Sequence, residues 1–368
     1  MDRLLFDGGP LAGGSLFEAP GRVIRADTFE AVPEAFAEME RAREAGFWLA
    51  GYAAFELGYA YSHKLRDLAP KGRGPYLLFG VFDAPRPAPA LNAGAAQLSR
   101  PEPLWSEANY ARAFARLRAY IAAGDVYQAN LTFPLTARYE GTAEALFAKL
   151  RARQPAPHGV LLELDGITLL SRSPELFFAL DAERNMTARP MKGTAARGEG
   201  AAADAAQAHW LRHSVKNRAE NLMIVDLLRN DMSRVSELGS VRVPHLYSIE
   251  TYDTLHQMTS TVTSRLRGDV GLAELFEGLF PCGSVTGAPK IRAMQIIAEL
   301  EQTARGAYCG AIGWVSPEGA MEFNVAIRTI ELLAGGEARL NVGGGVVYDS
   351  EAGSEYAEAL LKARFAEV

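Results

Sequence analysis

The sequence has few cysteines and no long apolar run, and each absence excludes a class of protein. Cys282 and Cys309 are the only cysteines among 368 residues, which excludes a disulfide-stapled scaffold and a site built on paired thiolates. Each is expected to be a plain buried thiol. The best apolar candidate, residues 47–55, is far too short to cross a membrane, and the start MDRLLFDGGP does not fit a secretory signal. We therefore expect a cytoplasmic protein that does not act in a membrane.

An excess of positive charge is also lacking. The chain has 38 basic and 44 acidic residues, a net charge of −6, which argues against nucleic acid as a partner because phosphate binding needs a basic surface. No GKS or GKT sequence provides a phosphate loop. With 48% hydrophobic residues, the chain can bury a large core, and a small molecule is the expected partner. An anionic molecule would need local positive charge from a metal or from selected arginines and lysines.

A connector rich in proline and alanine, residues 85–103, separates an N-terminal section, 1–84, from a larger region, 104–368. Helical spacing predicts a helix over 105–123, with Ser106 as its N-cap, and one long helix over 205–235. Alternating or apolar runs predict strands over 47–52, 76–82, 126–139, 159–164, 167–171 and 176–180. Adjacent strands with separate long helices indicate an α+β fold rather than regular βαβ alternation.

Two short motifs carry candidate acid, base or nucleophile chemistry. In PMKGT, Lys192 stands between a proline and a turn glycine, where partial burial would lower its pKa and make it a nucleophile. In SRSPE, Glu175 follows a predicted strand and a proline turn, where burial would keep it protonated as a general acid. The alternative for each is a solvated surface residue.

Carboxylates on two predicted helices form a candidate metal site. Lys216 and Glu220 are four residues apart, which also fits an ordinary salt bridge. Glu355 and Glu358 are three apart near the C-terminus, so their repulsion on an enclosed face would be relieved by a divalent cation. Oxygen ligands without histidine or cysteine favour Mg²⁺ over zinc. Lys362 could bind a substrate carboxylate or pair with Glu358.

Two further segments offer anion contacts. In GSVTGAPKIRAM, glycines and a proline precede a predicted helix, so its first amides could receive an anion near Lys290 and Arg292; a capped structural helix is the alternative. In FNVAIRT, the planar fork of Arg328 suits a carboxylate. Exposed amides of a glycine triplet, Gly343, Gly344 and Gly345, which follows a predicted strand over 338–342, could take the second oxygen.

The motifs SRSPE, PMKGT, AENLMIVDLLRND, GSVTGAPKIRAM, AYCGAIGW, FNVAIRT and GGGVVYDSEAGSEYAEALLKA, in this order, resemble the chorismate-utilising enzyme family over roughly residues 105–368. This family includes component I of anthranilate synthase, isochorismate synthase and salicylate synthase. The resemblance implies an α+β fold in which two large antiparallel β-sheets form a sandwich with helices outside. It also implies that the N-terminal section packs into the same body.

The resemblance implies roles for individual residues. Glu220 and Glu358 match the family's Mg²⁺ ligands, with Glu355 close to the metal, and Glu175 matches the acid that protonates the departing C4 hydroxyl of chorismate. The residues that match the family's substrate contacts are Ser284, Tyr308, Arg328, Lys362 and the amides of Gly343, Gly344 and Gly345.

The branch of the family is indicated by two positions. Lys192 stands where anthranilate synthases carry a small residue, and Gln128 stands where the water-adding members carry a base lysine. The resemblance therefore implies a transferase in which Lys192 attacks C2 of chorismate and ammonia then attacks C4. The product would be 4-amino-4-deoxychorismate, on the route to 4-aminobenzoate and folate. An anthranilate-forming enzyme and a catalytically silent chorismate-binding homologue remain the alternatives.

The sequence leaves two points undecided, the position of an active-site histidine and the source of ammonia. The stretch TLHQMTSTV resembles a segment with an active-site histidine, and the register leaves either His256 or Gln257 at that position. The chain also contains no cysteine-based amidotransferase segment, so ammonia would come from solution or from a glutamine amidotransferase subunit. That subunit is the partner that the resemblance implies.

Overall fold

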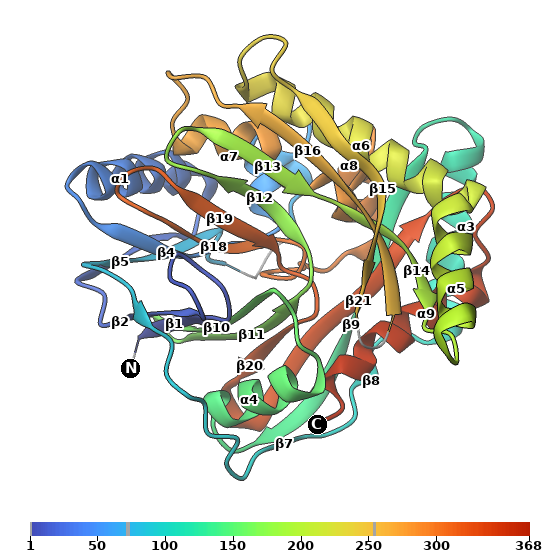
Figure 1. Cartoon of the computed structure of the whole chain (residues 1–368), viewed down its shortest axis with the longest axis horizontal. Helices are drawn as coiled ribbons and strands as arrows, with labels where there is room; N and C mark the ends of the chain where they lie inside the picture. The colour runs from blue at the N-terminus through green and yellow to red at the C-terminus, as the bar shows by residue number, and fades with distance from the viewer. Residues whose placement is uncertain (1, 71–73, 253–254) are drawn as a thin grey trace.

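The fold consists of two antiparallel β-sheets stacked face to face, with helices on both outer faces (Figure 1). The computed structural model describes residues 2–70, 74–252 and 255–368. The arrangement confirms the predicted α+β class and the predicted sandwich.

Within these described ranges, the first sheet has 11 strands, in the order β17-β9-β21-β20-β11-β10-β1-β2-β6, with β7 and β8 also paired to β9. Its strands are β1 (Arg3–Phe6), β2 (Ser15–Glu18), β6 (Arg86–Pro87), β7 (Gln97–Leu98), β8 (Glu102–Pro103), β9 (Gln128–Glu140), β10 (His158–Leu164), β11 (Ile167–Ser173), β17 (Gly287–Ala288), β20 (Thr329–Leu333) and β21 (Glu337–Val346).

The second sheet has 10 strands in the described part of the chain, in the order β14-β16-β13-β12-β19-β18-β4-β5-β3, with β15 paired to β16. Its strands are β3 (Arg22–Ala26), β4 (Trp48–Ala53), β5 (Leu77–Phe82), β12 (Leu176–Leu180), β13 (Asn185–Arg189), β14 (Met191–Ala196), β15 (Arg242–Thr251), β16 (Leu255–Arg265), β18 (Ala311–Val315) and β19 (Met321–Val325). The predicted strand over 176–180 is confirmed at both ends, and the other predicted strands are confirmed with shifted ends.

The helices that cover the sheets are α1 (Val32–Glu44), α2 (Leu57–Ala60), α3 (Glu107–Ala122), α4 (Ala143–Arg153), α5 (Ala201–His213), α6 (Val215–Val235), α7 (Leu272–Leu279), α8 (Lys290–Glu301) and α9 (Ala352–Ala363). Short 3₁₀ turns are η1 (Phe29–Ala31), η2 (Arg66–Leu68), η3 (Gly283–Val285), η4 (Ala334–Gly336) and η5 (Arg364–Ala366). Among the described helices, none combines the length and apolar character that crossing a lipid bilayer requires.

Helix ends follow local capping chemistry. The side chain of Ser106 accepts a hydrogen bond from the backbone N–H of Asn109, which confirms Ser106 as the N-cap of α3. The single long helix predicted over 205–235 is wrong, because the chain breaks into α5 and α6 at Ser214. Ser214 has an extended backbone and its hydroxyl accepts from the N–H of Asn217, so it caps a new helix.

Hydrophobic side chains form three layers because strand residues alternate between faces. Leu162 and Leu78 lie in the layer between the sheets. Leu161 belongs to the layer between the first sheet and helices α3, α4, α8 and α9. Phe79 belongs to the layer between the second sheet and helices α1, α6 and α7. Both faces of both sheets are therefore buried over much of their extent.

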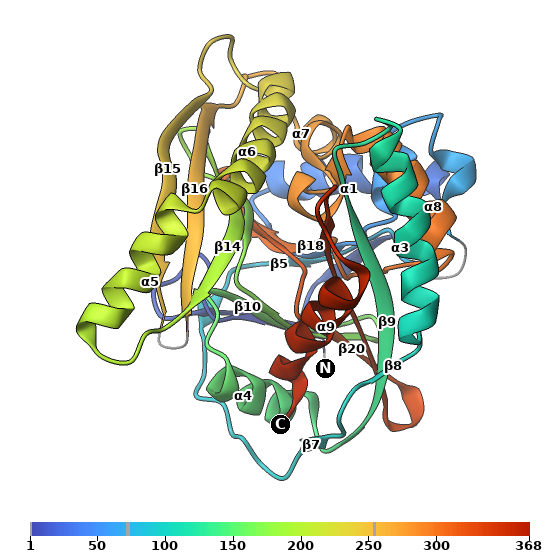
Figure 2. The same cartoon turned by 90° about the vertical axis from the view of Figure 1, so that its right-hand side faces the viewer.

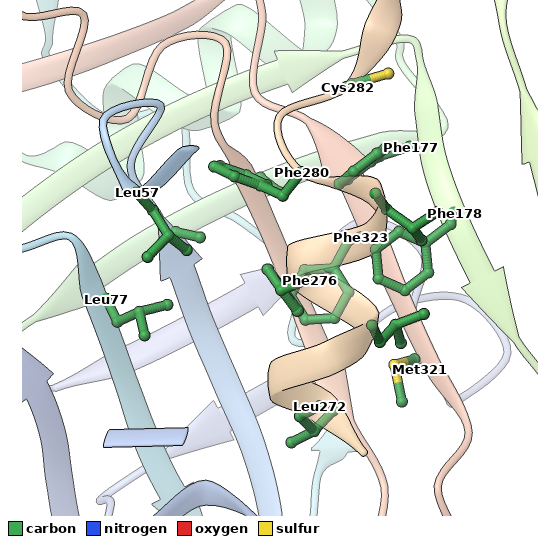
Figure 3. Packing of buried hydrophobic residues seen from close by; sticks show 14 of the residues in the cluster. Leu57, Leu77, Phe177, Phe178, Leu272, Phe276, Phe280, Cys282, Met321 and Phe323 are labelled. Carbon is green, nitrogen blue, oxygen red and sulfur yellow. The ribbon is translucent and has the colours of Figure 1, made fainter. Parts of the chain in front are cut away.

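Figure 3 shows part of the outer layer on the second sheet. Phe276 of α7 meets the ring of Phe323 of β19 edge-on, with ring centroids 5.2 Å apart. Phe178 of β12 stacks on the same ring at 5.3 Å. Phe280 continues this aromatic packing to the segment that begins at Cys282, so the core supports the turn that carries Ser284.

Strands from both sections of the chain share each sheet. In the second sheet, β4 of the N-terminal section pairs with β18, and in the first sheet β1 pairs with β10. The connector supplies β6, β7 and β8, so it runs along the first sheet as part of the body. Figure 2 looks onto the side where β14, β9 and α9 lie near one another, and the candidate site is on this side.

Candidate active site

Lys192 is the second residue of β14, the strand at one end of the second sheet. Its ammonium group donates to the carbonyl of Ser284 in η3 over 3.4 Å, and its side chain is half-buried. Burial lowers the pKa of Lys192 and the nearby positive charge of Lys362 lowers it further, while the carboxylates of Glu175 and Glu220 oppose the shift. Lys192 therefore has a larger neutral fraction than an exposed lysine, as a nucleophile requires.

Glu175 lies in the two-residue turn between β11 and β12 and is 5% exposed. Its backbone is held on both sides: its N–H donates to the hydroxyl of Ser173 at 3.2 Å, and its carbonyl accepts from the N–H of Val325 at 3.0 Å. Burial raises the pKa of Glu175, and the side chain of Ser284 and the charge of Lys192 oppose this. Within the described residues, its Oε1 atom is buried without a hydrogen-bond partner.

Ser284 interacts with both Lys192 and Glu175. Its carbonyl accepts from Lys192, its hydroxyl influences the pKa of Glu175, and the same hydroxyl lies 3.2 Å from the Sγ atom of Cys282. The structure therefore brings together an amine, a carboxyl and a hydroxyl from three separate motifs. The two pKa shifts have opposite directions, which is typical of an acid and a nucleophile tuned for one reaction.

Both cysteines are free, buried thiols, as the sequence predicted. Burial raises the pKa of Cys282 and of Cys309 to about 12 each. Neither is therefore a thiolate at neutral pH, and neither is a nucleophile.

The carboxylates predicted to bind a metal come from α6 and α9. Burial raises the pKa of Glu220, and the negative charges of Glu355 and Glu358 contribute to the rise, against Lys192 and Lys216. The Lys216–Glu220 pair is loose, at 4.0 Å, and the hydroxyl of Ser350 donates to Glu355 at 2.7 Å. The three carboxylates therefore share one electrostatic neighbourhood.

Glu358 is more exposed than Glu220 and forms an ion pair with Lys362. Burial alone would raise its pKa, but the ammonium of Lys362, 2.9 Å away, outweighs burial and lowers it. The i,i+4 pair predicted from the spacing is thus confirmed. In the part of the chain that the structure describes, no three histidine, cysteine, aspartate or glutamate side chains are close enough together to enclose a metal ion.

This donor set fits Mg²⁺ better than a metal that needs a closed protein cage. Mg²⁺ usually keeps several waters and takes one or two carboxylates together with oxygens of a substrate. Glu220 and Glu358 supply such carboxylates from two helices, and burial together with the neighbouring carboxylates disfavours the charged form of Glu220, a cost that a cation would relieve.

Arg328 and Tyr308 are two further predicted substrate contacts. Arg328 has a left-handed backbone, with φ of 51°, between β19 and β20. Burial lowers its pKa and the charge of Glu175 opposes this, and its guanidinium makes no hydrogen bond or ion pair with any described residue. Tyr308 is 8% exposed, and burial raises its pKa well above the usual value, so its phenol stays protonated as a donor.

The glycine triplet lies inside a strand rather than after one. β21 continues through the triplet, and Gly343 and Gly344 pair with Thr132 and Leu131 of β9. Both glycines are buried, so they do not present the exposed amides that the sequence suggested. A Cβ on Gly344 would lie 3.3 Å from both the Glu355 carboxylate and the Lys362 ammonium. At Gly344, where β21 has no side chain, the strand thus faces the charged side chains of α9.

Lys362 belongs to the same face. Its ammonium donates to the carbonyl of Gly343 at 3.0 Å as well as to Glu358. Lys362 and Gly343 are 19 positions apart in the sequence and meet because α9 packs directly on β21.

The start of α8, where the sequence suggested an anion site, has its cationic side chains paired with acidic residues. Lys290 pairs with the buried Asp231 at 2.8 Å and also donates to the carbonyl of Leu279 at 2.8 Å. Arg292 pairs with Asp125 at 2.9 Å. Both cations are already partnered, so the structure favours a structural role for the start of this helix.

His256 and Gln257 point to opposite faces of β16, as neighbouring strand residues must. His256 is buried and its ring nitrogens lie 2.9 Å from Asp204 and from Thr251. Gln257 donates to the carbonyl of Gly193, the residue after Lys192, at 2.8 Å. Gln257 therefore contacts the Lys192 segment through the backbone of Gly193, and the ring of His256 is engaged by Asp204 and Thr251.

A protein-family model described as chorismate binding enzyme matches residues 83–367. This covers far more than half of the chain. The chain belongs to the chorismate-binding enzyme family.

Curated members of this family support the same placement. The chain is 44% identical over 257 residues to aminodeoxychorismate synthase component 1 of Klebsiella aerogenes, covering 70% of this chain and 56% of that protein. It is 42% identical over 253 residues to aminodeoxychorismate synthase component 1 of Escherichia coli K12, covering 69% and 55%. The matched region thus spans about half the length of these curated relatives.

Solved structures of the family share the fold. Anthranilate synthase component I from Streptococcus pneumoniae TIGR4 superposes with a TM-score of 0.82 at 23% identity, covering 100% of this chain and 92% of that one. A putative isochorismate synthase, DhbC, from Bacillus anthracis gives a TM-score of 0.78 at 22% identity, covering 99% and 94%. At this identity the likeness establishes the chorismate-binding enzyme fold and nothing finer.

Sequence reasoning missed the contact of Gln257 with Gly193 and the close packing of Gly193 on α6. A Cβ on Gly193 would lie 3.0 Å from the side chain of Asn217. The period of two along TLHQMT was the available signal, because it separates the faces of His256 and Gln257. The packing of Gly193 on Asn217 has no such signal, because the two residues come from different elements.

Proposed function

We propose that this chain aminates chorismate at C4 with ammonia to give 4-amino-4-deoxychorismate, a precursor of 4-aminobenzoate and hence of folate. The observation that carries the proposal is the electrostatic coupling of Lys192 and Glu175, whose pKa values shift in opposite directions in one buried place. The curated relatives named aminodeoxychorismate synthase component 1 support the same assignment.

In the proposed reaction, the neutral amine of Lys192 attacks C2 of the ring. Both conjugated ring double bonds shift, and the C4 hydroxyl leaves as water after receiving the proton of Glu175. Ammonia then attacks C4, the two double bonds shift back, and the bond between Lys192 and C2 breaks. The new ammonium group loses a proton, which restores Glu175. Lys192 returns to the amine form, and the net change is the replacement of a hydroxyl by an amino group with release of water.

The substrate carboxylates would be held by the predicted contact residues. Arg328, whose guanidinium has no partner among the described residues, offers a planar fork suited to the enolpyruvyl carboxylate, and Tyr308 offers a protonated phenol. Ser284 and Lys362 complete the set of donors. These contacts would orient C2 toward Lys192 and C4 toward Glu175.

We include Mg²⁺ in the proposal, held by Glu220 and Glu358 with Glu355 close by. When bound, it would supply positive charge that offsets part of the negative charge of the ring carboxylate of chorismate and of the three glutamates. The raised pKa of Glu220, caused by burial and by Glu355 and Glu358, supports a cation at this place.

A glutamine amidotransferase subunit is the proposed source of ammonia. The name "component 1" of the curated relatives supports a second component for those proteins. The two free, buried cysteines are compatible with a cytoplasmic location, which we also propose.

The test is identification of the product formed by the purified chain from chorismate, an ammonium salt and Mg²⁺. We expect a product with the mass of 4-amino-4-deoxychorismate that becomes 4-aminobenzoate only after addition of a separate lyase. Direct accumulation of fluorescent anthranilate would show the alternative activity instead. Unchanged chorismate after long incubation would indicate a silent homologue.

A further inference from the structure

Three buried charged side chains have no role in the proposed reaction but contact the segments that carry candidate substrate-binding residues. Glu56, Arg305 and Glu301 are 1%, 2% and 4% exposed. Glu56 precedes α2 in the N-terminal section, Glu301 ends α8, and Arg305 follows α8. Burying charges is unfavourable unless each is paired and hydrogen-bonded, and here each has defined partners.

Arg305 is the centre of this cluster. Its guanidinium donates two hydrogen bonds to the carboxylate of Glu301, from Nε to Oε2 at 2.9 Å and from Nη2 to Oε1 at 2.7 Å. Its remaining donors bridge two backbone carbonyls, Nη1 to Val285 at 2.9 Å and Nη2 to Asn130 at 2.7 Å. The plane also lies over the ring of Phe55, 4.3 Å from its centroid. One side chain thus ties together α8, η3 and β9.

The two bridged carbonyls belong to elements that carry candidate substrate contacts. Val285 follows Ser284 in η3. Asn130 of β9 is paired with Gly345 of β21. Any displacement of the Arg305 plane would therefore shift η3 relative to the glycine strand.

Glu56 fixes the loop that leads to Tyr308. Its Oε1 accepts from the backbone N–H of Arg305 at 2.7 Å and its Oε2 from that of Gly306 at 3.0 Å. The N–H of Phe55 donates in return to the carbonyl of Gly306 at 2.8 Å. Tyr308 is two residues further on, so a residue of the N-terminal section sets the path of this loop.

We propose that Arg305, supported by Glu301 and Glu56, is a positioning residue that holds the segments carrying Ser284, Tyr308 and Gly345 in one relative arrangement before chorismate binds. The inference rests on the proposed function in that Ser284 and Tyr308 are taken to contact the substrate. Holding them in advance removes an ordering cost from binding, which raises affinity without any direct contact from Arg305.

The geometry requires arginine rather than any cation. Only a guanidinium presents five donors in a planar fork, and Arg305 uses them on Glu301 and on two carbonyls at once. A lysine could keep the charge next to Glu301 but could not reach all of these acceptors together. Arg305→Lys therefore separates charge pairing from positioning.

The test compares chorismate binding, steady-state kinetics and amide hydrogen exchange in the full chain. For Arg305→Lys we expect the KM and the dissociation constant for chorismate to rise about tenfold or more, with a smaller fall in kcat. Exchange should become faster in residues 283–286 and 304–310. The matched control is Arg184→Lys, because Arg184 also bridges two carbonyls, of Arg267 and Val270, but in a turn that carries no candidate site residue. The control should leave affinity and exchange at the site unchanged.

Two more variants keep the proposal testable if Arg305→Lys does not fold. Arg305→Met combined with Glu301→Leu removes both charges of the pair, so no charge is left uncompensated, and Glu56→Gln keeps Arg305 intact. Both should also weaken chorismate binding. Wild-type affinity and unchanged exchange in folded variants would overturn the proposal, and so would unfolding of all three, which would make the cluster purely structural. A wild-type chain that binds chorismate but forms no aminated product would refute the proposed function and leave the binding test of Arg305 valid.

Discussion

At the scale of single residues, the amine of Lys192 is the group on which the proposed amination depends most directly. Lys192→Ala deletes the proposed covalent route without removing a core side chain, so we expect the rate of chorismate amination to fall by at least about 100-fold. Thermal unfolding should change little. The control is Lys64→Ala, because Lys64 is exposed and lies outside the site. A wild-type rate in Lys192→Ala would disprove the nucleophile assignment.

The pH profile follows from the two shifted groups. Lys192 must be neutral to attack, so the rate should rise with pH as it loses its proton, and its lowered pKa moves this rise to lower pH. Glu175 must be protonated to donate, so the rate should fall as it ionises, and its raised pKa moves this fall to higher pH. We expect a bell-shaped profile of kcat/KM.

Glu175→Gln tests the falling limb of that profile. The variant should lose most of its activity and should no longer show the fall that belongs to Glu175. A carboxyl with a raised folded-state pKa loses stability as pH rises from its ordinary value through the folded value. The glutamine variant should therefore unfold at an equal or higher temperature than wild type above that range. The exposed Glu183→Gln serves as control, and an unchanged profile in Glu175→Gln would contradict the acid role.

Glu358 provides the residue-scale test of magnesium binding. Glu358→Gln removes one proposed ligand charge, so the Mg²⁺ concentration for half-maximal activity should rise by about tenfold or more. Glu351→Gln, at the exposed N-cap of the same helix, should leave it unchanged. Superimposable magnesium titrations of wild type and Glu358→Gln would remove Glu358 from the proposed site.

At the scale of elements, the close packing of β14 on α6 holds Lys192 in place. Gly193 has φ of 89°, and a Cβ there would lie 3.0 Å from Asn217. Gly193→Ala should destabilise the chain by about 2–3 kcal/mol and reduce activity, because it combines an unfavourable φ with a clash. Gly166→Ala is the matched control, since Gly166 has φ of 77° and a Cβ there would meet nothing within 4 Å.

The control should cost about 1 kcal/mol and leave activity intact. The difference between the two variants, measured by chemical unfolding and by chorismate turnover, isolates the contact with Asn217. Equal effects on stability together with full activity in both would show that this contact does not position Lys192.

Several elements were predictable from local chemistry and others were not. The cap at Ser106 and the strand β12 follow from side-chain type and period in a short window. The break at Ser214 was missed because the helical pattern continues across it. The burial of Gly344 within β21 was missed because glycines usually interrupt strands, and here the ladder to β9 and the approach of α9 require them.

At the scale of the whole molecule, the two sections of the chain complete each other's sheets. Removal of residues 1–84 would expose the edges of β18 and β10, together with the apolar face around Ile312 and Trp314. We expect the truncated chain to aggregate, and we expect the intact chain to unfold in one transition. Trp48 and Trp314 lie with ring centroids 5.9 Å apart across this boundary, so their fluorescence should change together with circular dichroism.

A chain cut within the connector and expressed as two fragments is the matching control, because all strand partners are then present. Restored solubility and chorismate binding would support the shared-sheet argument. A soluble, chorismate-binding fragment without residues 1–84 would contradict it.

The sequence by itself determined the α+β class, several strands, the cap at Ser106 and the family, and it supplied the residue types that the proposed acid, amine and magnesium site would require. These depend on local period, capping and motif chemistry, which a short window of sequence contains. The tertiary structure alone decided that Lys192 meets Ser284, that Gln257 bonds to the carbonyl of Gly193 while His256 contacts Asp204, and that Lys290 is already paired. Such contacts join residues far apart in the chain, so they depend on strand order and layer packing, which no local pattern specifies.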